Sequence, residues 1–228
     1  MNQVPALQTA VDRYSNALAV PTMLEKLHPR KQGNPGNAGA LAPAIVLTSI
    51  SAYEGFAEEF LAILAAHRGQ NYAQVAKFVT MNNPTVATFE SKLKQLLQWP
   101  ANQNWEKQFS MSVWDPPREG ASTWITQRTL SWNETKDQAE GWMQVRHCLS
   151  HGLVRGYRPE IWPGPLKGTV QASGVLRPQK NGKHSLSLHG AESCAHIYRL
   201  AAQQLSDAAV GYAALASLNW SNCPDFAL

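Results

Sequence analysis

Apolar side chains recur at helical spacing along most of this sequence. The clearest case is residues 43–67, where Ala52, Phe56 and Phe60 fall on one side of a helix and Glu54 and Glu58 fall largely elsewhere. The other segments with this period are residues 4–27, 71–80, 84–97, 134–153 and 191–218. We therefore expect a mainly α fold, a bundle of about four or five helices, in which Pro21 kinks or splits the first segment.

The helical pattern is absent between residues 99 and 132. Five tryptophans lie there among prolines and glycines, at Trp99, Trp105, Trp114, Trp124 and Trp132. A loop of this length is uncommon in a compact domain unless it is functional or packed by its own side chains. We favour tryptophans that anchor the loop to the helical core, and the alternative is a set of platforms on which nucleic-acid bases stack.

A β-hairpin is expected between the last two long helices. Residues 169–176 and 184–188 have the composition of strands, and Asn181-Gly182 is a typical turn pair between them. The hairpin as a whole spans residues 168–190.

Length and composition indicate one globular domain over residues 1–228. Hydrophobic residues make up 44% of the chain and charged residues 16%, which excludes a disordered protein. Residues 1–40 are expected to form an N-terminal helical extension and loop, and residues 42–218 the core.

Cysteine usage and the terminal sequence indicate a cytoplasmic protein. Cys148, Cys194 and Cys223 are too few and too scattered for a disulfide framework, and no CxxC pair suggests a zinc ribbon. Residues 1–11 lack the basic and apolar stretches of a secretory signal, and we find no uncharged apolar run long enough to span a bilayer. We therefore expect no membrane partner.

Basic residues gather in the later part of the chain. The formal net charge is +4, and between residues 146 and 199 only Glu160 and Glu192 oppose the basic side chains, which are Arg146, Arg155, Arg158, Lys167, Arg177, Lys180, Lys183 and Arg199. This distribution favours a phosphate-rich partner, whose binding salt would weaken. Charge alone leaves a solvated basic surface equally open.

The segment Arg146-His147-Cys148-Leu149-Ser150-His151-Gly152 carries the candidate chemistry. An arginine supplies a permanent planar cation that grips phosphate oxygens and the extra charge of a phosphorane-like transition state. A histidine titrates near neutral pH and moves a proton to or from a reacting oxygen. Attack of a ribose 2′-hydroxyl on the neighbouring phosphate needs these two services and no metal.

The spacing of the segment limits how its side chains meet. At about 3.6 residues per turn, Arg146 and His151 do not share a face of a regular helix. His147 and His151 are four residues apart and do share one, as do His151 and Arg155. Arg146 and His151 converge if the helix loosens near Gly152, or if a second copy of the chain completes the site.

The motif resembles the signature of HEPN domains. That signature is an arginine, a polar residue that is often asparagine, three further residues and a histidine, and Arg146, His147 and His151 match it in order. The histidine at position 147 departs from the commoner asparagine but is still polar. The resemblance extends loosely over residues 42–218, through the order of a long acidic helix, the motif helix and a last long helix.

The resemblance implies a helical bundle that dimerises into one composite active site and cleaves RNA, as in toxins and defence effectors, leaving a 2′,3′-cyclic phosphate. It implies no cofactor and no metal. His151 would then carry out acid–base catalysis, Arg146 would stabilise the phosphate and His147 would orient it. Supporting residues would be Glu54 or Glu58, holding Arg146, and Ser150 as a polar neighbour without a role in the reaction. Arg155, Arg158 and Lys167 would bind RNA, and an antitoxin or regulatory protein is a further candidate partner.

Other interpretations of the same residues stay open at this point. Arg146 and His151 also suit a structural ion pair and a histidine at a helix end. His147 and His151 have zinc-binding spacing, but Cys148 stands where helical zinc peptidases carry glutamate, and no third ligand is evident. Cys148 is more typical of a packed side chain than of a nucleophile. The alternative function is a non-catalytic HEPN module that binds RNA, nucleotide or a protein.

Overall fold

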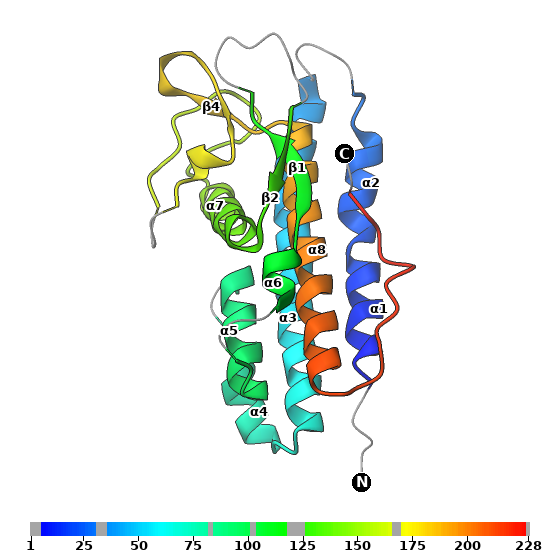
Figure 1. Ribbon diagram of the computed structural model, residues 1–228. Coiled ribbons are helices and arrows are strands. Elements are labelled where there is room, and N and C mark those ends of the chain that lie inside the picture. Colours follow the sequence, from blue (N-terminus) through cyan, green and yellow to red (C-terminus); the bar gives the residue numbers. More distant parts are fainter. Residues whose placement is uncertain are drawn as a thin grey trace.

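Two long helices form the centre of the fold. A computed structural model describes residues 6–30, 36–81, 84–100, 104–117, 126–165 and 170–226. Helix α3 (Leu41–His67) and helix α8 (Leu188–Tyr212) pack along one another through the length of the molecule (Figure 1). The predicted mainly α fold is confirmed.

Helix α3 is apolar nearly all round because it is covered on several sides. Its buried side chains include Ile45, Ile50, Tyr53, Phe60 and Leu64. They contact helices α1, α2, α4, α5, α7 and α8. By length and composition alone, the helical stretch Ala38–His67 is also apolar enough to cross a membrane, as the core helix of a soluble bundle often is. This stretch contains Glu54, Glu58 and Glu59, so it does not contradict the expectation that no uncharged apolar run of that length is present.

The first predicted helix is split, as Pro21 indicated. Helix α1 (Gln8–Ala17) ends at Leu18, and helix α2 (Ala19–Leu27) then begins with Pro21 in its first turn. Proline is tolerated there because the first amides of a helix have no carbonyl partner within it. Both helices pack against α3.

Helices α4 (Tyr72–Val79) and α5 (Val86–Leu97) lie where the sequence predicted them. Asn71 and Gln74 form a reciprocal capping box at the start of α4, and Thr85 caps α5. These local signals explain why the starts of both helices are readable from sequence.

The tryptophan-rich segment is not a structureless loop. It contains helix α6 (Asn104–Gln108) and an antiparallel pair of strands, β1 (Met111–Asp115) and β2 (Thr126–Leu130). The pair lies on α8, where Ser193 Oγ accepts a hydrogen bond from the Trp114 amide at 2.8 Å. Strands this short give little periodicity, so the sequence did not indicate them.

The tryptophans of this segment anchor it to the core, as favoured above. Trp99, Trp114 and Trp132 are buried, and Trp105 packs on Trp132 with 4.9 Å between ring centroids. Trp124 lies outside the described residues. These four described rings are therefore not platforms for bases.

The motif helix is α7 (Trp132–Ser150), which starts at a capping box between Ser131 and Glu134. Figure 1 shows α7 nearly end-on while α3 and α8 run along the page, so α7 crosses the central pair. The helix ends at Ser150, short of the predicted residue 153, and Leu153 is 49% exposed.

The predicted hairpin is present but shorter and shifted. Strands β3 (Arg177–Pro178) and β4 (His184–Ser185) pair antiparallel, and Asn181 in the turn has a left-handed φ of 60°. The strand predicted at 169–176 is wrong: Ala172–Gly174 is a 3₁₀ turn, and Val175 and Leu176 are buried. A Cβ on Gly141 of α7 would lie 2.7 Å from Val175, so this apolar run packs on a helix and does not pair in a sheet. Residue 169 itself lies outside the described residues.

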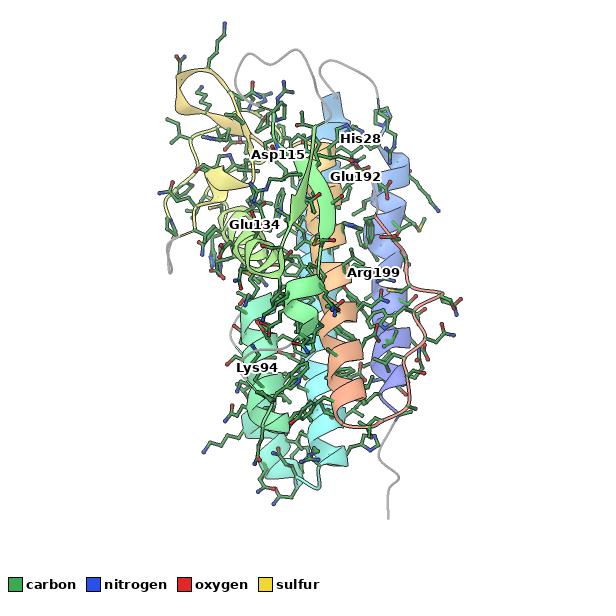
Figure 2. All side chains as sticks on the ribbon, in the orientation of Figure 1. His28, Lys94, Asp115, Glu134, Glu192 and Arg199 are labelled. Atoms are coloured by element: carbon green, nitrogen blue, oxygen red, sulfur yellow. The ribbon has the colours of Figure 1, made fainter. Side chains whose placement is uncertain are left out.

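The chain after α8 returns along α1 as a C-terminal strap, residues 214–226 (Figure 1). Helix α8 ends at Tyr212 and not at 218, so the strap starts earlier than predicted. Trp220 packs edge-on against Tyr14 and Phe56, and its indole donates to Asp207 at 3.0 Å. Arg199, midway along α8, stacks on the Trp220 ring, with 5.3 Å from guanidinium carbon to centroid (Figure 2).

We predict that Trp220→Ala destabilises the protein by about 3–5 kcal/mol, because a buried aromatic is lost and Asp207 loses a donor. Chemical unfolding monitored by circular dichroism measures this. Leu215→Ala in the same strap is the control, since Leu215 is 37% exposed. Equal unfolding midpoints for the two variants would contradict the anchoring role of Trp220.

Candidate active site

The motif ends in a glycine-terminated helix stop. Gly152 has a φ of 65°, and the Leu153 amide donates to the Cys148 carbonyl at 2.9 Å while the Gly152 amide donates to Leu149 at 3.2 Å. This pattern of bonds is a Schellman motif, in which the left-handed residue closes the helix. His151 therefore sits at the C-terminal cap of α7, and the chain turns away directly after it.

The two motif histidines lie against one another. Their ring centroids are 5.9 Å apart with an interplanar angle of 20°. His151 is exposed and His147 is half-buried, so one imidazole faces solvent and the other supports it. Ser150 is exposed, and its hydroxyl donates to the His147 carbonyl at 3.2 Å. The hydroxyl is thus bonded to the backbone of the last helical turn.

Arg146 reaches across to helix α3. Its Nη2 lies 3.1 Å from Glu54 Oε2, with the side chains 21% and 16% exposed. Of the two glutamates proposed from sequence, Glu54 is thus the partner of Arg146. Glu58 is exposed and acts on the site through its charge near Glu54.

Burial sets the electrostatics of this ion pair. Desolvation raises the pKa of Glu54, the Arg146 cation lowers it in part, and the charge of Glu58 raises it further. Within the described part of the chain, Glu54 Oε1 is buried and accepts no hydrogen bond. The carboxylate is therefore committed to Arg146 through one oxygen, and its ionised form is costly in the fold.

Cys148, between the two histidines, points into the core. It is 3% exposed, and burial raises the pKa of its thiol. Both observations favour the packed side chain over the nucleophile. In the described ranges, no three histidine, cysteine, aspartate or glutamate side chains are grouped so that they could hold a metal ion.

The segment after the motif, residues 152–165, is here called the post-motif loop. It carries Arg155 and Arg158, both exposed, and Lys167 lies outside the described residues. Glu160 organises this loop, a role that was not predicted from the sequence. Its carboxylate accepts from the Arg155 amide at 3.0 Å and from the Gly156 amide at 3.2 Å. The sequence feature that could have indicated this role is the position of Glu160 as an acidic residue among basic ones.

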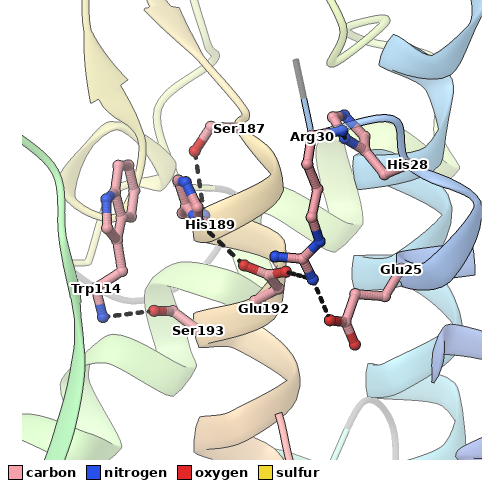
Figure 3. Close-up of polar contacts among 9 residues, drawn as sticks. Glu25, His28, Arg30, Trp114, Ser187, His189, Glu192 and Ser193 are labelled. Atoms are coloured by element: carbon pink, nitrogen blue, oxygen red, sulfur yellow. Dashed lines mark hydrogen bonds and ion pairs between the residues drawn. The ribbon is translucent and has the colours of Figure 1, made fainter. Parts of the chain in front are cut away.

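A second polar cluster lies at the start of α8 (Figure 3). Arg30 pairs with Glu192 at 2.8 Å and also with Glu25, and Glu192 contacts His189 at 3.1 Å. Burial raises the pKa of Glu25, helped by the charge of Glu192, and Arg30 offsets part of the increase. The cluster fastens the end of α2 to α8 and involves none of the motif residues.

The structure therefore forms two pairs from the predicted site, Arg146 with Glu54 and His147 with His151.

Compared with protein-family models, with curated proteins and with solved structures, the chain gives no match.

Two glycines at and after the helix stop yield a prediction about stability. Gly152, which closes the helix, has a φ of 65° and room for a Cβ. Gly156 has a φ of 78°, and a Cβ there would lie 2.6 Å from Leu149 and 3.0 Å from Pro43. Gly152→Ala should cost about 1–2 kcal/mol from left-handed strain alone, and Gly156→Ala should cost more because overpacking adds about 1–3 kcal/mol.

Thermal unfolding of both variants measures the difference, with Gly164→Ala as the control because its Cβ would meet nothing within 4 Å and its φ is not left-handed. A Gly156→Ala protein as stable as Gly164→Ala would show that the loop does not pack on α7 in this way.

Proposed function

We propose that this chain is a metal-independent endoribonuclease of the HEPN type. The observation that carries the proposal is the paired, solvent-facing imidazole of His151 at the end of α7, within two turns of an arginine oriented by Glu54. An exposed proton-transfer group and a clamped cation on one helix end are what transesterification of RNA requires.

The reaction follows from these groups. The ribose 2′-oxygen attacks the adjacent phosphorus while a histidine removes the 2′ proton, and the bond from phosphorus to the 5′-oxygen breaks as that oxygen takes up a proton. The products are a 2′,3′-cyclic phosphate and a 5′-hydroxyl. His151 would carry out the proton transfers, Arg146 would stabilise charge on the phosphate, and His147 would hold the orientation of His151 and the scissile group.

The direction of the two side chains favours a second copy of the chain. Arg146 points toward α3, whereas His151 lies at the exposed helix end. A dimer that juxtaposes two helix ends would supply two histidines, one as base and one as acid, in one composite cleft. On this proposal the substrate is RNA and the protein acts in the cytoplasm. Its role would be that of a toxin or defence effector, and a partner protein would restrain it.

We predict that His151→Ala lowers cleavage by about 100- to 10,000-fold, the usual contribution of an acid–base residue, and that Arg146→Ala is similarly impaired. The measurement is cleavage of labelled total RNA in excess EDTA, with the ends of the products identified as cyclic phosphates.

Two matched controls separate chemistry from fold. His67→Ala removes an exposed histidine at the end of α3. Arg13→Ala removes an arginine of α1 that pairs with Glu59 of α3. Both should cleave like the wild type. Undiminished cleavage by the His151 and Arg146 variants would overturn the site, and RNA binding without cleavage by any protein would favour the non-catalytic module.

Glu54 is proposed as a positioning residue, and its raised pKa gives a separate prediction. Because the folded pKa lies above the unfolded one, ionised Glu54 costs stability as the pH rises through the folded pKa. Glu54→Gln should therefore leave stability at neutral pH little changed while it lowers kcat by about tenfold or more, since Arg146 loses its charged anchor. Parallel unfolding and cleavage assays test this, and a loss of stability as large as the loss of activity would assign Glu54 a structural role only.

A further inference from the structure

The post-motif loop exposes apolar side chains beside the candidate site. Tyr157 is 40% exposed, Leu153 49% and Ile161 73%, in a protein whose described tryptophans are largely covered. Scattered exposed apolar residues need no explanation, but these three fall within nine residues of one loop.

The loop is held in place, so this exposure is a property of an ordered surface. The Glu160 carboxylate binds the amides of Arg155 and Gly156, and its backbone pairs in both directions with His184, at 2.9 and 2.8 Å. The Trp162 indole donates to the His184 carbonyl at 3.2 Å. The hairpin therefore supports one end of the loop and Glu160 closes the other.

Packing brings the loop back over the last turn of α7. Gly156 fits so closely against Leu149 and Pro43 that no Cβ is accommodated without movement. Leu149 lies in the same turn as His151. Tyr157, the next residue after Gly156, therefore lies beside the last turn of α7, although Leu149 and His151, which are two residues apart, leave that turn on different sides.

The charges of the loop favour an anionic partner. Arg155 and Arg158 are exposed, and the Arg158 guanidinium lies 5.7 Å from the centroid of the Tyr157 ring. The carboxylate of Glu160 accepts hydrogen bonds from backbone amides. It therefore competes less with an anionic partner for the two arginine side chains. An exposed aromatic ring with cations around it matches the way proteins bind unpaired nucleotides, with bases on rings and phosphates on basic side chains.

We propose that Tyr157 is the stacking platform for an unpaired base next to the scissile phosphate, with Arg155 and Arg158 on the flanking phosphates, so that the enzyme selects single-stranded RNA. This inference rests on the proposed function for the meaning of the scissile phosphate. A base in a duplex is already stacked on both sides and has no face to offer the ring.

The test uses the full chain and a fluorescent single-stranded oligonucleotide with 2′-O-methyl riboses, which cannot be cleaved by 2′-oxygen attack. Tyr157→Ala should weaken binding by about 10- to 100-fold, the usual loss for one stacked base. Tyr157→Phe keeps the ring and should bind like the wild type. Tyr72→Ala is the matched control, because Tyr72 is 88% exposed on α4.

Cleavage kinetics on unmodified RNA separate this inference from the proposed function. Tyr157→Ala should raise KM with little change in kcat, and a duplex of the same sequence should be a poor substrate for the wild type. Cleavage that needs His151 but is indifferent to Tyr157 would overturn the inference and leave the ribonuclease standing. Tyr157-dependent binding with no cleavage would overturn the ribonuclease and leave Tyr157 as an RNA-binding residue.

Three further results would also overturn it: no binding of the single strand by the wild type, equal losses for the Ala and Phe variants, or unchanged binding by Tyr157→Ala. In the last case the exposed loop would be a surface for a protein partner. Thermal unfolding of each variant checks that the change lies at the surface and not in the fold.

Discussion

The burial of α3 is the constraint on which the rest of this structure depends. A helix that is apolar nearly all round has to be surrounded, and α1, α2, α4, α5, α7 and α8 are the elements that do so. Glu54 is a polar exception on this helix, half-buried where α7 crosses it. A carboxylate in that place needs a cation, and Arg146 of α7 supplies it. The ion pair is thus a consequence of core packing as well as the proposed anchor of Arg146.

The way α7 ends decides what its two histidines can do. Had the helix continued, His151 would have been one more side chain along its surface. The left-handed Gly152 closes the last turn, and the chain leaves at once for the post-motif loop. The imidazole is therefore supported by His147 on one side and open on the other. Such an arrangement combines a defined ring position with exposure to solvent.

The aromatic residues of this chain divide between the core and an exposed loop. The tryptophan-rich segment was expected to anchor itself to the helical core, with platforms for bases as the alternative, and its described rings do pack there, around α6, β1 and the start of α7. Among the described residues, Tyr157 is exposed beside the last turn of α7, in a loop of prolines and glycines. The exposure of Tyr157 was not predicted from the sequence, because burial depends on which distant element covers a segment.

Local interactions made much of the fold readable from the sequence. The capping residues Asn71 and Ser131 and the break at Pro21 act within a few residues of themselves, so these helix limits were predictable to within a few residues, whereas the end of α7 was placed too late, at 153. The motif residues Arg146, His147 and His151 were singled out by their chemistry and by the resemblance to the HEPN signature, and their catalytic role stays a prediction. The choice of Glu54 over Glu58, the β1–β2 pair and the placement of Val175 on Gly141 were decided only by the tertiary structure. Each of these depends on contacts between residues far apart in the chain, and helical or strand periodicity carries no record of which distant surface a side chain will meet.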